Sequence, residues 1–282
     1  MKAALAVNPV SWDEDRHAAN MVDIMVMMQN AAKAGADLVL FPEAALTGLI
    51  NNDRPSHDLG LGIAEQDGEV SMLSDLARKL RLYAGIGLLE REGRRLYDSA
   101  FLFAPDGSIA LKYRRITRGW HGKKAAARVY GAGRNVSKVK TPLGSFTFLI
   151  CGDMFDERLV RFVRELKPDW LLVPFARCFE DGSCDQQRWT NEELPAYVEQ
   201  VRRIGVSTLM TNYLWRSNRN ELIIPADAKL EPAPAFRRDR EHASRADRKL
   251  DSAFGGAAVI AGDGRVLASL PLGRTGLLLA DL

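Results

Sequence analysis

The chain has 282 residues, and 46% of them are apolar, which is enough for one large hydrophobic core or two smaller ones. Its net charge is +3 and its charged fraction is 27%, so it lacks the concentrated basic face of a nucleic-acid-binding protein. Three cysteines are too few for a disulfide scaffold and favour a reduced, cytoplasmic setting. The sequence contains no run of about 18 apolar residues that predicts a membrane span, and its short apolar start predicts a strand, not a signal peptide.

The first half of the chain alternates between strand and helix patterns. Apolar runs bounded by turn residues predict strands, and apolar residues at helical spacing predict helices. The predicted elements are a strand over Ala3–Val7, a helix over Asp15–Lys33, a strand over Asp37–Phe41, a helix over Ser71–Leu80, a strand over Tyr83–Leu89, and a hairpin of Leu96–Phe103 with Ser108–Tyr113.

The second half continues the alternation and ends in a second hairpin. Its predicted elements are a strand over Thr147–Ile150, a helix from the cap Asp156 to Leu166, a strand over Trp170–Val173, a helix over Glu192–Arg203, a strand over Val206–Thr211, and a strand pair, Gly256–Ile260 with Arg265–Ser269. This mixture of βα units and hairpins predicts an α/β protein with a mixed sheet. The charged, proline-bearing segment Pro225–Asp251 is predicted to be a long surface excursion.

Three short segments each place a reactive side chain at or near the end of a strand-like run. Glu43 follows Val-Leu-Phe-Pro, Lys112 continues Ile-Ala-Leu, and Cys151 follows Phe-Thr-Phe-Leu-Ile. A thiolate that attacks carbon, a carboxylate that moves protons and an ammonium that stabilises negative charge can together perform covalent acyl transfer. Each residue also has a plainer interpretation. Cys151 fits a buried cysteine that closes a strand, Glu43 a solvated turn, and Lys112 an exposed strand end.

The ordered set of motifs resembles the nitrilase superfamily of carbon–nitrogen hydrolases. FPEAALTG at 41–48 matches the family's Pro-Glu after a strand, LKYRR at 111–115 its Lys-Tyr-Arg-Lys-like stretch, and LICGD at 149–153 its Ile-Cys-Tyr-Asp-like stretch. Their spacing, 69 residues from Glu43 to Lys112 and 39 from Lys112 to Cys151, looks ordinary for the family. TPLG at 141–144 and the late segment 254–264 are also similar to the family, so the likeness covers nearly the whole chain.

The resemblance implies a fold and a set of roles. Cys151 would be the nucleophile, Glu43 the general base, and Lys112 the group that stabilises the oxyanion, helped by the backbone N–H of Gly152. The implied architecture is α/β, a four-layer αββα sandwich with mixed β-sheets, in a single domain over residues 1–282. The resemblance also implies homodimers or larger homo-oligomers and no metal or organic cofactor.

Two departures from the family pattern bear on the site. Ala126 stands where many members carry a second glutamate that helps orient the lysine. Lys112 is therefore expected to have one acidic partner fewer, unless Asp153 or Glu157 replaces that glutamate. Gly152 stands where an aromatic residue is usual beside the nucleophile, and its small size is expected to widen the pocket.

The substrate is predicted by class alone. Arg177 could hold a substrate carboxylate with two parallel hydrogen bonds, or it could form a surface salt bridge with Glu180 or Asp181. Tyr130, Trp120 and Phe155 are candidate pocket walls, and ordinary core packing is the alternative for each. The resemblance implies hydrolysis of a small linear amide, including ω-amides and N-carbamoyl amides. The alternatives are a nitrile hydrolase, a degenerate member that binds without turnover, and an acyltransferase.

Overall fold

The protein is represented by a computed structural model that describes residues 1–11, 17–49, 53–215 and 253–282. Its helices are α1 (His17–Lys33), α2 (Pro55–Leu61), α3 (Gly68–Leu80), α4 (Glu157–Leu166), α5 (Gln186–Arg188) and α6 (Leu194–Ile204). Its strands are β1 (Lys2–Val7), β2 (Pro9–Val10), β3 (Leu38–Leu40), β4 (Tyr83–Glu92), β5 (Arg95–Phe103), β6 (Ile109–Arg114), β7 (Val139–Thr141), β8 (Gly144–Phe148), β9 (Trp170–Phe175), β10 (Ser207–Asn212), β11 (Leu214–Trp215), β12 (Gly255–Ile260), β13 (Val266–Leu272) and β14 (Gly276–Asp281). Two shorter helical segments are a 3-10 turn over Cys151–Phe155 and a π-helical turn over Trp189–Glu193.

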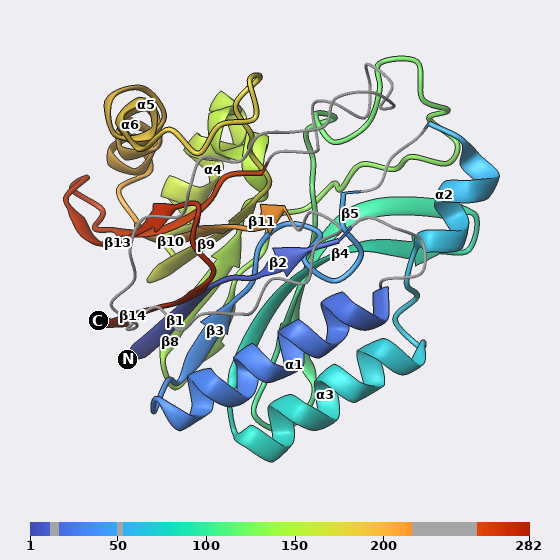
Figure 1. The fold of residues 1–282 in the computed structure, drawn as a ribbon, viewed down its shortest axis with the longest axis horizontal. Helices are drawn as coiled ribbons and strands as arrows, with labels where there is room; N and C mark the ends of the chain where they lie inside the picture. The colour runs from blue at the N-terminus through green and yellow to red at the C-terminus, as the bar shows by residue number, and fades with distance from the viewer. Residues whose placement is uncertain (12–16, 50–52, 216–252) are drawn as a thin grey trace.

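The strands form two six-stranded mixed sheets. The first has the order β14-β1-β3-β4-β5-β6, and the second has the order β13-β12-β10-β9-β8-β7. In each sheet the central strands are parallel and the outer strands are antiparallel, as the register of β1 with β3 and of β10 with β12 illustrates. The two ends of the chain meet in the first sheet, where β1 pairs with β14 (Figure 1).

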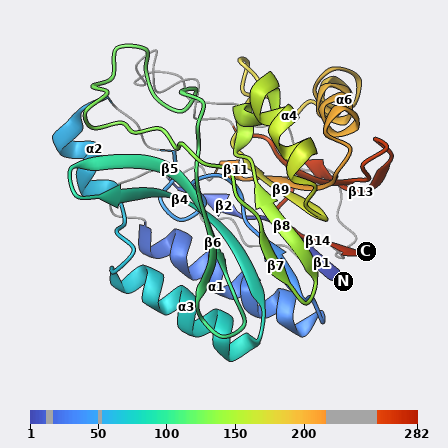
Figure 2. The same cartoon turned by 180° about the vertical axis from the view of Figure 1, so that it is seen from behind.

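The two sheets pack face to face between two layers of helices, as the two opposite views show (Figures 1 and 2). The alternation of side chains along β1 explains the layering, because successive residues point to opposite faces of a strand. Ala4 joins the cluster of α1 and α3, whereas Leu5 joins the core between the sheets. Helices α4 and α6 cover the outer face of the second sheet through residues such as Val163 and Val201. The predicted α/β fold with an αββα sandwich is confirmed.

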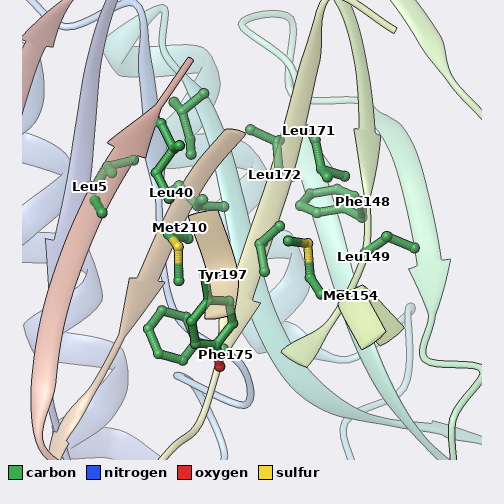
Figure 3. Close-up of a cluster of buried hydrophobic side chains, with 14 of the residues drawn as sticks. Leu5, Leu40, Phe148, Leu149, Met154, Leu171, Leu172, Phe175, Tyr197 and Met210 are labelled. Atoms are coloured by element: carbon green, nitrogen blue, oxygen red, sulfur yellow. The ribbon is translucent and has the colours of Figure 1, made fainter. Parts of the chain in front are cut away.

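The core between the sheets is continuous and apolar. Leu40 of β3, Phe148 of β8 and Met210 of β10 all belong to this cluster, and Tyr197 of α6 extends the same cluster on the outer face of the second sheet (Figure 3). All four side chains are nearly or fully buried. Parallel strands that are covered on both faces need unbroken apolar runs, which explains why the sequence pattern identified them.

Most predicted elements are confirmed, with small shifts at their ends. The predicted cap is confirmed: the Asp156 side chain accepts hydrogen bonds from the backbone N–H groups of Arg158 and Leu159 at the start of α4. Strand β8 ends at Phe148, before the predicted Ile150, because the chain turns sharply at Cys151. Helix α2 and strand β14 were not predicted.

Two predicted segments lie wholly or partly outside the residues that the structure describes. Pro225–Asp251 lies outside them, as do the first two residues of the predicted helix over Asp15–Lys33. Within the described ranges, none of the helices has both the length and the apolar character that crossing a bilayer would require.

Candidate active site

Cys151 lies at a sharp turn between strand β8 and helix α4. Its φ of 47° is in the left-handed region, which costs a non-glycine residue about 1–3 kcal/mol and persists where the surroundings fix it. It opens the 3-10 turn that leads into α4, and the residue is 8% exposed. A strained turn from strand to helix is the geometry that presents a nucleophile at the end of a sheet.

Glu43 lies just beyond the carboxyl end of β3, in the first sheet, and is fully buried. A glycine on the neighbouring strand allows this placement. A Cβ atom on Gly87 of β4 would lie 2.2 Å from the carbonyl oxygen of Pro42 and 2.8 Å from the Cα of Glu43. Gly87 therefore lets the Glu43 backbone pack directly against β4, which a residue with a side chain would prevent.

The cation beside these two residues is Arg115, at the end of β6. Its Nη1 lies 2.6 Å from Glu43 Oε1 and 3.4 Å from Asp98 Oδ2, and its Nε donates to Thr117 Oγ1 at 3.1 Å. The Arg115 side chain is 5% exposed. Burial disfavours the guanidinium charge, but the charges of Glu43, Cys151 and Asp98 outweigh burial and raise the pKa of Arg115. The guanidinium is thus the buried positive charge that contacts Glu43 and Asp98.

The prediction that Lys112 lies within reach of Cys151 is wrong. Lys112 Nζ donates to Glu65 Oε2 at 2.7 Å and to Glu90 Oε1 at 3.0 Å, and it lies 5.6 Å from the centre of the Phe101 ring. Phe101 belongs to the cluster under α1 and α3, on the helix side of the first sheet. Lys112 therefore points away from the face that carries the thiol.

The alternation of side chains along β6 is the physical reason. Leu111 and Tyr113 face the core between the sheets, so Lys112 faces the opposite side and Arg115 returns to the Tyr113 side. In the stretch Lys-Tyr-Arg-Lys, Arg115 occupies the place of the second lysine. The two-residue period of a strand, counted from the buried Leu111 and Tyr113, leads to Arg115. That signal was present in the sequence but was not used.

Glycines make room for the Arg115 guanidinium. A Cβ atom on Gly152 would lie 2.8 Å from Arg115 Nη2, and one on Gly119 would lie 2.7 Å from the same nitrogen. The expected widening of the pocket at Gly152 is therefore wrong, because the guanidinium fills that space. The lack of a side chain at Gly152 is a steric requirement of Arg115.

Asp98 is a second acid of the site that the sequence analysis did not identify. It lies on β5, is 1% exposed and faces both Arg115 and Glu43. The pKa of Glu43 is raised from 4.5 to about 8. Burial is the largest cause and negative charge on Cys151 adds to it, whereas the charge of Arg115 and a hydrogen bond with Asp98 oppose them. Burial, followed by the charge of Glu43, raises the pKa of Asp98 well above its ordinary value.

Asp153 and Glu157 do not stand beside Lys112. Asp153 is fully buried and accepts hydrogen bonds from the Tyr113 hydroxyl at 2.6 Å and from the Thr117 backbone N–H at 2.8 Å. It thereby ties the segment after β6 to the turn that carries the thiol. Glu157 is exposed and pairs with Arg203.

The expectation that Ala126 leaves Lys112 short of an acidic partner is also wrong. Lys112 has two acidic partners of its own, Glu65 and Glu90. Ala126 lies in the turn before Tyr130, where its carbonyl oxygen accepts hydrogen bonds from the backbone N–H groups of Val129 and Tyr130. The second carboxylate beside the site's cation comes instead from Asp98.

Tyr130 lies in an apolar cluster with Ala44, Leu49 and Trp120. Its hydroxyl donates to the buried Asp58 Oδ2 at 2.5 Å, and its ring contacts Trp120 edge-on at 5.9 Å. Because Ala44 follows Glu43 directly, this cluster borders the site on the side of the first sheet. The hydroxyl of Tyr130 is engaged by Asp58.

Arg177 follows β9 and pairs with an acid that the sequence analysis did not name. Its Nη2 lies 2.9 Å from both carboxylate oxygens of Glu193, instead of pairing with Glu180 or Asp181. The negative charge of Cys151 is one of the causes that raise the pKa of Arg177, although burial, the largest contribution, opposes them. Arg177 therefore lies on the thiol's side of the site, already paired and 45% exposed.

Phe155 and Tyr197 lie near the turn that carries Cys151. Phe155 is 45% exposed and contacts the buried Tyr197 ring edge-on at 5.3 Å. Among the described residues, no three His, Cys, Asp or Glu side chains are arranged so that they could hold a metal ion.

The sequence matches a known family profile and several characterised proteins. The carbon–nitrogen hydrolase profile matches residues 2–192. An aliphatic nitrilase from Sinorhizobium fredii is 29% identical over 144 residues, which cover 46% of this chain and 46% of that nitrilase. Nitrilase 1 from Arabidopsis thaliana is 30% identical over 138 residues, which cover 43% of this chain and 39% of that protein. The chain thus spans less than half the length of these curated relatives.

Solved structures resemble the whole chain at low sequence identity. A carbon–nitrogen hydrolase from Helicobacter pylori G27 superposes with a TM-score of 0.75 at 18% identity, over 99% of this chain and 88% of the other. The NitN amidase from Nesterenkonia sp. AN1 superposes with a TM-score of 0.72 at 21% identity, over 100% and 92%. One variant of the Nesterenkonia amidase carries the acetamide moiety of fluoroacetamide at its active-site cysteine. At these identities the likeness establishes the fold.

Proposed function

The chain belongs to the carbon–nitrogen hydrolase family of the nitrilase superfamily, and we propose that it hydrolyses a small linear amide through a covalent intermediate on Cys151. The observation that carries this proposal is the Cys151 turn itself, with a buried carboxylate and a buried guanidinium facing the thiol. These groups match the three tasks of covalent acyl transfer: attack, proton movement and charge stabilisation.

In the first half-reaction, Glu43 takes the Cys151 proton while the sulfur attacks the amide carbon. The C–N bond then breaks, Glu43 returns the proton to the leaving nitrogen, and an acyl thioester remains on Cys151. In the second half-reaction, water attacks the thioester carbon and gives its proton to Glu43. The C–S bond breaks, Glu43 gives that proton to the Cys151 sulfur, and the carboxylic acid leaves.

In this proposal Arg115 performs the task that the sequence analysis gave to Lys112. Its guanidinium would stabilise the oxyanion of each tetrahedral intermediate together with the backbone N–H of Gly152. A guanidinium keeps its proton at all working pH values, so Arg115 would supply charge and hydrogen bonds but no proton. Glu43 would therefore carry every proton transfer.

The substrate pocket includes residues whose roles stay predictions. We propose that Arg177, Gly152 and Tyr130 border the substrate, with Arg177 near its solvent end because that side chain is half-exposed. A carboxylate on the substrate would compete with Glu193 for Arg177. The class of amide fits ω-amides and N-carbamoyl amides equally well.

Two other activities remain as alternatives. Nitrile hydrolysis is supported by the nitrilases among the curated relatives. Binding without turnover is supported by the short contact of 2.6 Å between Arg115 and Glu43, which holds the proposed base in an ion pair. Thiol reactivity separates turnover from mere binding, because a competent site makes Cys151 a fast nucleophile.

Mass spectrometry of the intact protein tests the proposal. After brief exposure to a panel of amides and nitriles, we expect an acyl adduct on Cys151 and release of ammonia. Cys151→Ala should lose both signals, and Cys184→Ala, which removes an exposed cysteine, is the matched control. Turnover that survives in Cys151→Ala would overturn the assignment.

The family resemblance also supports proposals about assembly and setting. We propose a homodimer or larger homo-oligomer in the cytoplasm, with residues 1–282 forming one domain. Phe162 of α4 and Phe155 of the turn before it, each 45% exposed, are apolar surface residues that a second copy could cover. Sedimentation that shows only a species of 31.3 kDa at micromolar concentration would contradict the oligomer.

A further inference from the structure

Two carboxyl groups and one guanidinium share a buried site in this protein. Glu43 is 0% exposed, Asp98 is 1% exposed, and Arg115 Nη1 is the guanidinium nitrogen that faces both. If both acids were ionised, the group would carry a net negative charge away from water. Buried charge without a counter-charge is costly, so such a group favours taking up a proton.

The hydrogen bonds of the two acids point to where that proton lies. Glu43 Oε2 and Asp98 Oδ1 are both buried and lack a hydrogen-bond partner among the described residues. The two carboxyl groups are nevertheless close enough to interact with each other. Two ionised carboxylates in contact repel, whereas a proton on one of them turns it into a hydrogen-bond donor to the other.

We propose that Glu43 and Asp98 share one proton in the resting protein, with Asp98 as the neutral carboxylic acid that donates a hydrogen bond to the ionised Glu43. This inference rests on the proposed function, because it assigns Asp98 as a positioning residue for the base of that reaction. The raised pKa values of both acids agree with a pair that keeps a proton at neutral pH.

The distances to Arg115 decide which acid is ionised. Glu43 Oε1 lies 2.6 Å from Nη1, and Asp98 Oδ2 lies 3.4 Å from the same atom, so the guanidinium stabilises negative charge more strongly on Glu43. The negative charge of Asp153, on the turn beside Cys151, adds to the cost of ionising Asp98.

Among the residues that the structure describes, the other titratable groups that contact the pair's neighbours are two tyrosines and supply no second positive charge. Tyr113 of β6 donates its hydroxyl proton to Asp153, and burial, with that charge, raises its pKa well above 10.0. Tyr197 of α6 is fully buried, and burial likewise raises its pKa well above 10.0. Both tyrosines therefore stay neutral at working pH, and Arg115 remains the cation that faces the pair.

This arrangement keeps the site electrically balanced during the reaction. At rest, Arg115 is positive and Glu43 is negative. When Glu43 takes the thiol proton, the S–H bond breaks, an O–H bond forms, and the negative charge moves to the Cys151 sulfur. With Asp98 neutral, the thiolate forms beside the Arg115 guanidinium and two neutral carboxyl groups, with the half-exposed Arg177 further toward solvent. With Asp98 ionised, it would form beside a carboxylate that opposes it.

The test combines infrared spectroscopy with thiol alkylation. Wild-type protein at neutral pH should show the C=O stretch of a protonated carboxylic acid, and the difference spectrum against Asp98→Asn should lose it. The pH midpoint of Cys151 alkylation by iodoacetamide, followed by mass spectrometry, should move by less than about half a pH unit in Asp98→Asn. Asn keeps the size and the donor of a neutral acid.

Two results overturn the proposal. One is a wild-type spectrum without the protonated band. The other is a midpoint that falls by about one unit or more in Asp98→Asn, because removing an ionised neighbour would speed thiolate formation about tenfold below the midpoint. If Asp98→Asn fails to fold, Glu43→Gln replaces it in the infrared experiment. That change should let Asp98 ionise against Arg115, and a band that persists contradicts a shared proton.

A matched control keeps this test separate from the proposed function. Glu90→Gln removes another buried acid, on the helix side of the same sheet, and should change neither the band nor the midpoint. A wild-type Cys151 that iodoacetamide does not modify would count against the nucleophile itself. If iodoacetamide modifies Cys151 in the wild type but the pH midpoint of that reaction falls in Asp98→Asn, the result would count against the shared proton alone.

Discussion

The two faces of strand β6 hold their cations in different ways. On the helix side, Lys112 and Arg114 contact Glu90 together, and their side chains are 32% and 20% exposed. On the side of the second sheet, Arg115 is 5% exposed and its carboxylate partners are fully buried. A cation near water is screened, whereas one in a dry site acts strongly on the groups beside it. The comparison shows that the face of β6 on which a cation lies, and not its residue type, determines whether it lies beside Glu43 and Cys151.

The largest expected difference in turnover is between variants of the carboxylates on the two faces, Glu43 and Glu90. Glu43→Gln should lower turnover by about 10²–10⁴-fold, because general base catalysis contributes about that much. Glu90→Gln, an equally buried change on the helix side, should leave the rate per folded molecule unchanged. Steady-state kinetics on both variants, with circular dichroism as the folding check, makes the comparison. Equal losses in the two would mean that burial, and not proton transfer, explains the effect.

The cations on the two faces give the next largest contrast. Arg115→Ala should lower kcat by about 10²–10³-fold, the typical loss for one oxyanion-stabilising donor. Lys112→Ala should leave kcat nearly unchanged, because its ammonium faces Glu65 and Glu90 on the other side of the sheet. The ratio of the two kcat values is the measurement. A large loss in Lys112→Ala with little loss in Arg115→Ala would restore the original assignment.

Sequence reasoning identified the fold and two of the site residues by the same means. The ordered motifs around Glu43 and Cys151 sit after buried strands, and the structure brings both residues together at the facing ends of the two sheets. Their catalytic roles stay predictions. Lys112 was misplaced because a motif matched by residue type ignores the two-residue period that sets the face of a strand.

Other features were harder to predict for physical reasons. Asp98 sits in the apolar run Leu96–Phe103. An acid in or after a buried strand suggests a functional role, but this reasoning was used for Glu43 and not for Asp98. Its partner Arg115 lies 17 residues away in the sequence, so the local sequence pattern does not predict that the two side chains pair. Helix α2 is only 7 residues long and contains a glycine, which weakens its helical pattern. Strand β14 is recognisable as a strand mainly through its pairing with β1.

A steric change at Gly152 should have an intermediate effect and sharpen the placement of Arg115. A methyl group there would press on Arg115 Nη2, and overpacking typically costs about 1–3 kcal/mol. If the overpacking destabilises the transition state by that free energy, Gly152→Ala slows turnover about 10- to 100-fold. Gly60→Ala is the matched control, because a Cβ there meets nothing within 4 Å.

The double variant Gly152→Ala with Arg115→Lys tells whether the guanidinium causes that loss. A lysine removes the second nitrogen that clashes, so the double variant should be faster than the sum of the two single losses predicts. Strict additivity in this double-mutant cycle would show that Gly152 acts independently of Arg115.

The smallest expected effect is on stability, at Lys112. Replacing Lys112 with methionine keeps an unbranched side chain and removes the ammonium that pairs with Glu65 and Glu90. Because Glu90 keeps Arg114 as a partner and an exposed ion pair is typically worth about 0–1 kcal/mol, the loss should be small. Because salt screens exposed charges, the difference in unfolding free energy between wild type and Lys112→Met should shrink as ionic strength rises. Urea unfolding at low and high salt measures it. The same salt change should leave the effect of Arg115→Met nearly constant, because the Arg115 pair is buried. If the Lys112 difference resisted salt while the Arg115 difference faded, the contrast between the two faces of β6 would be reversed.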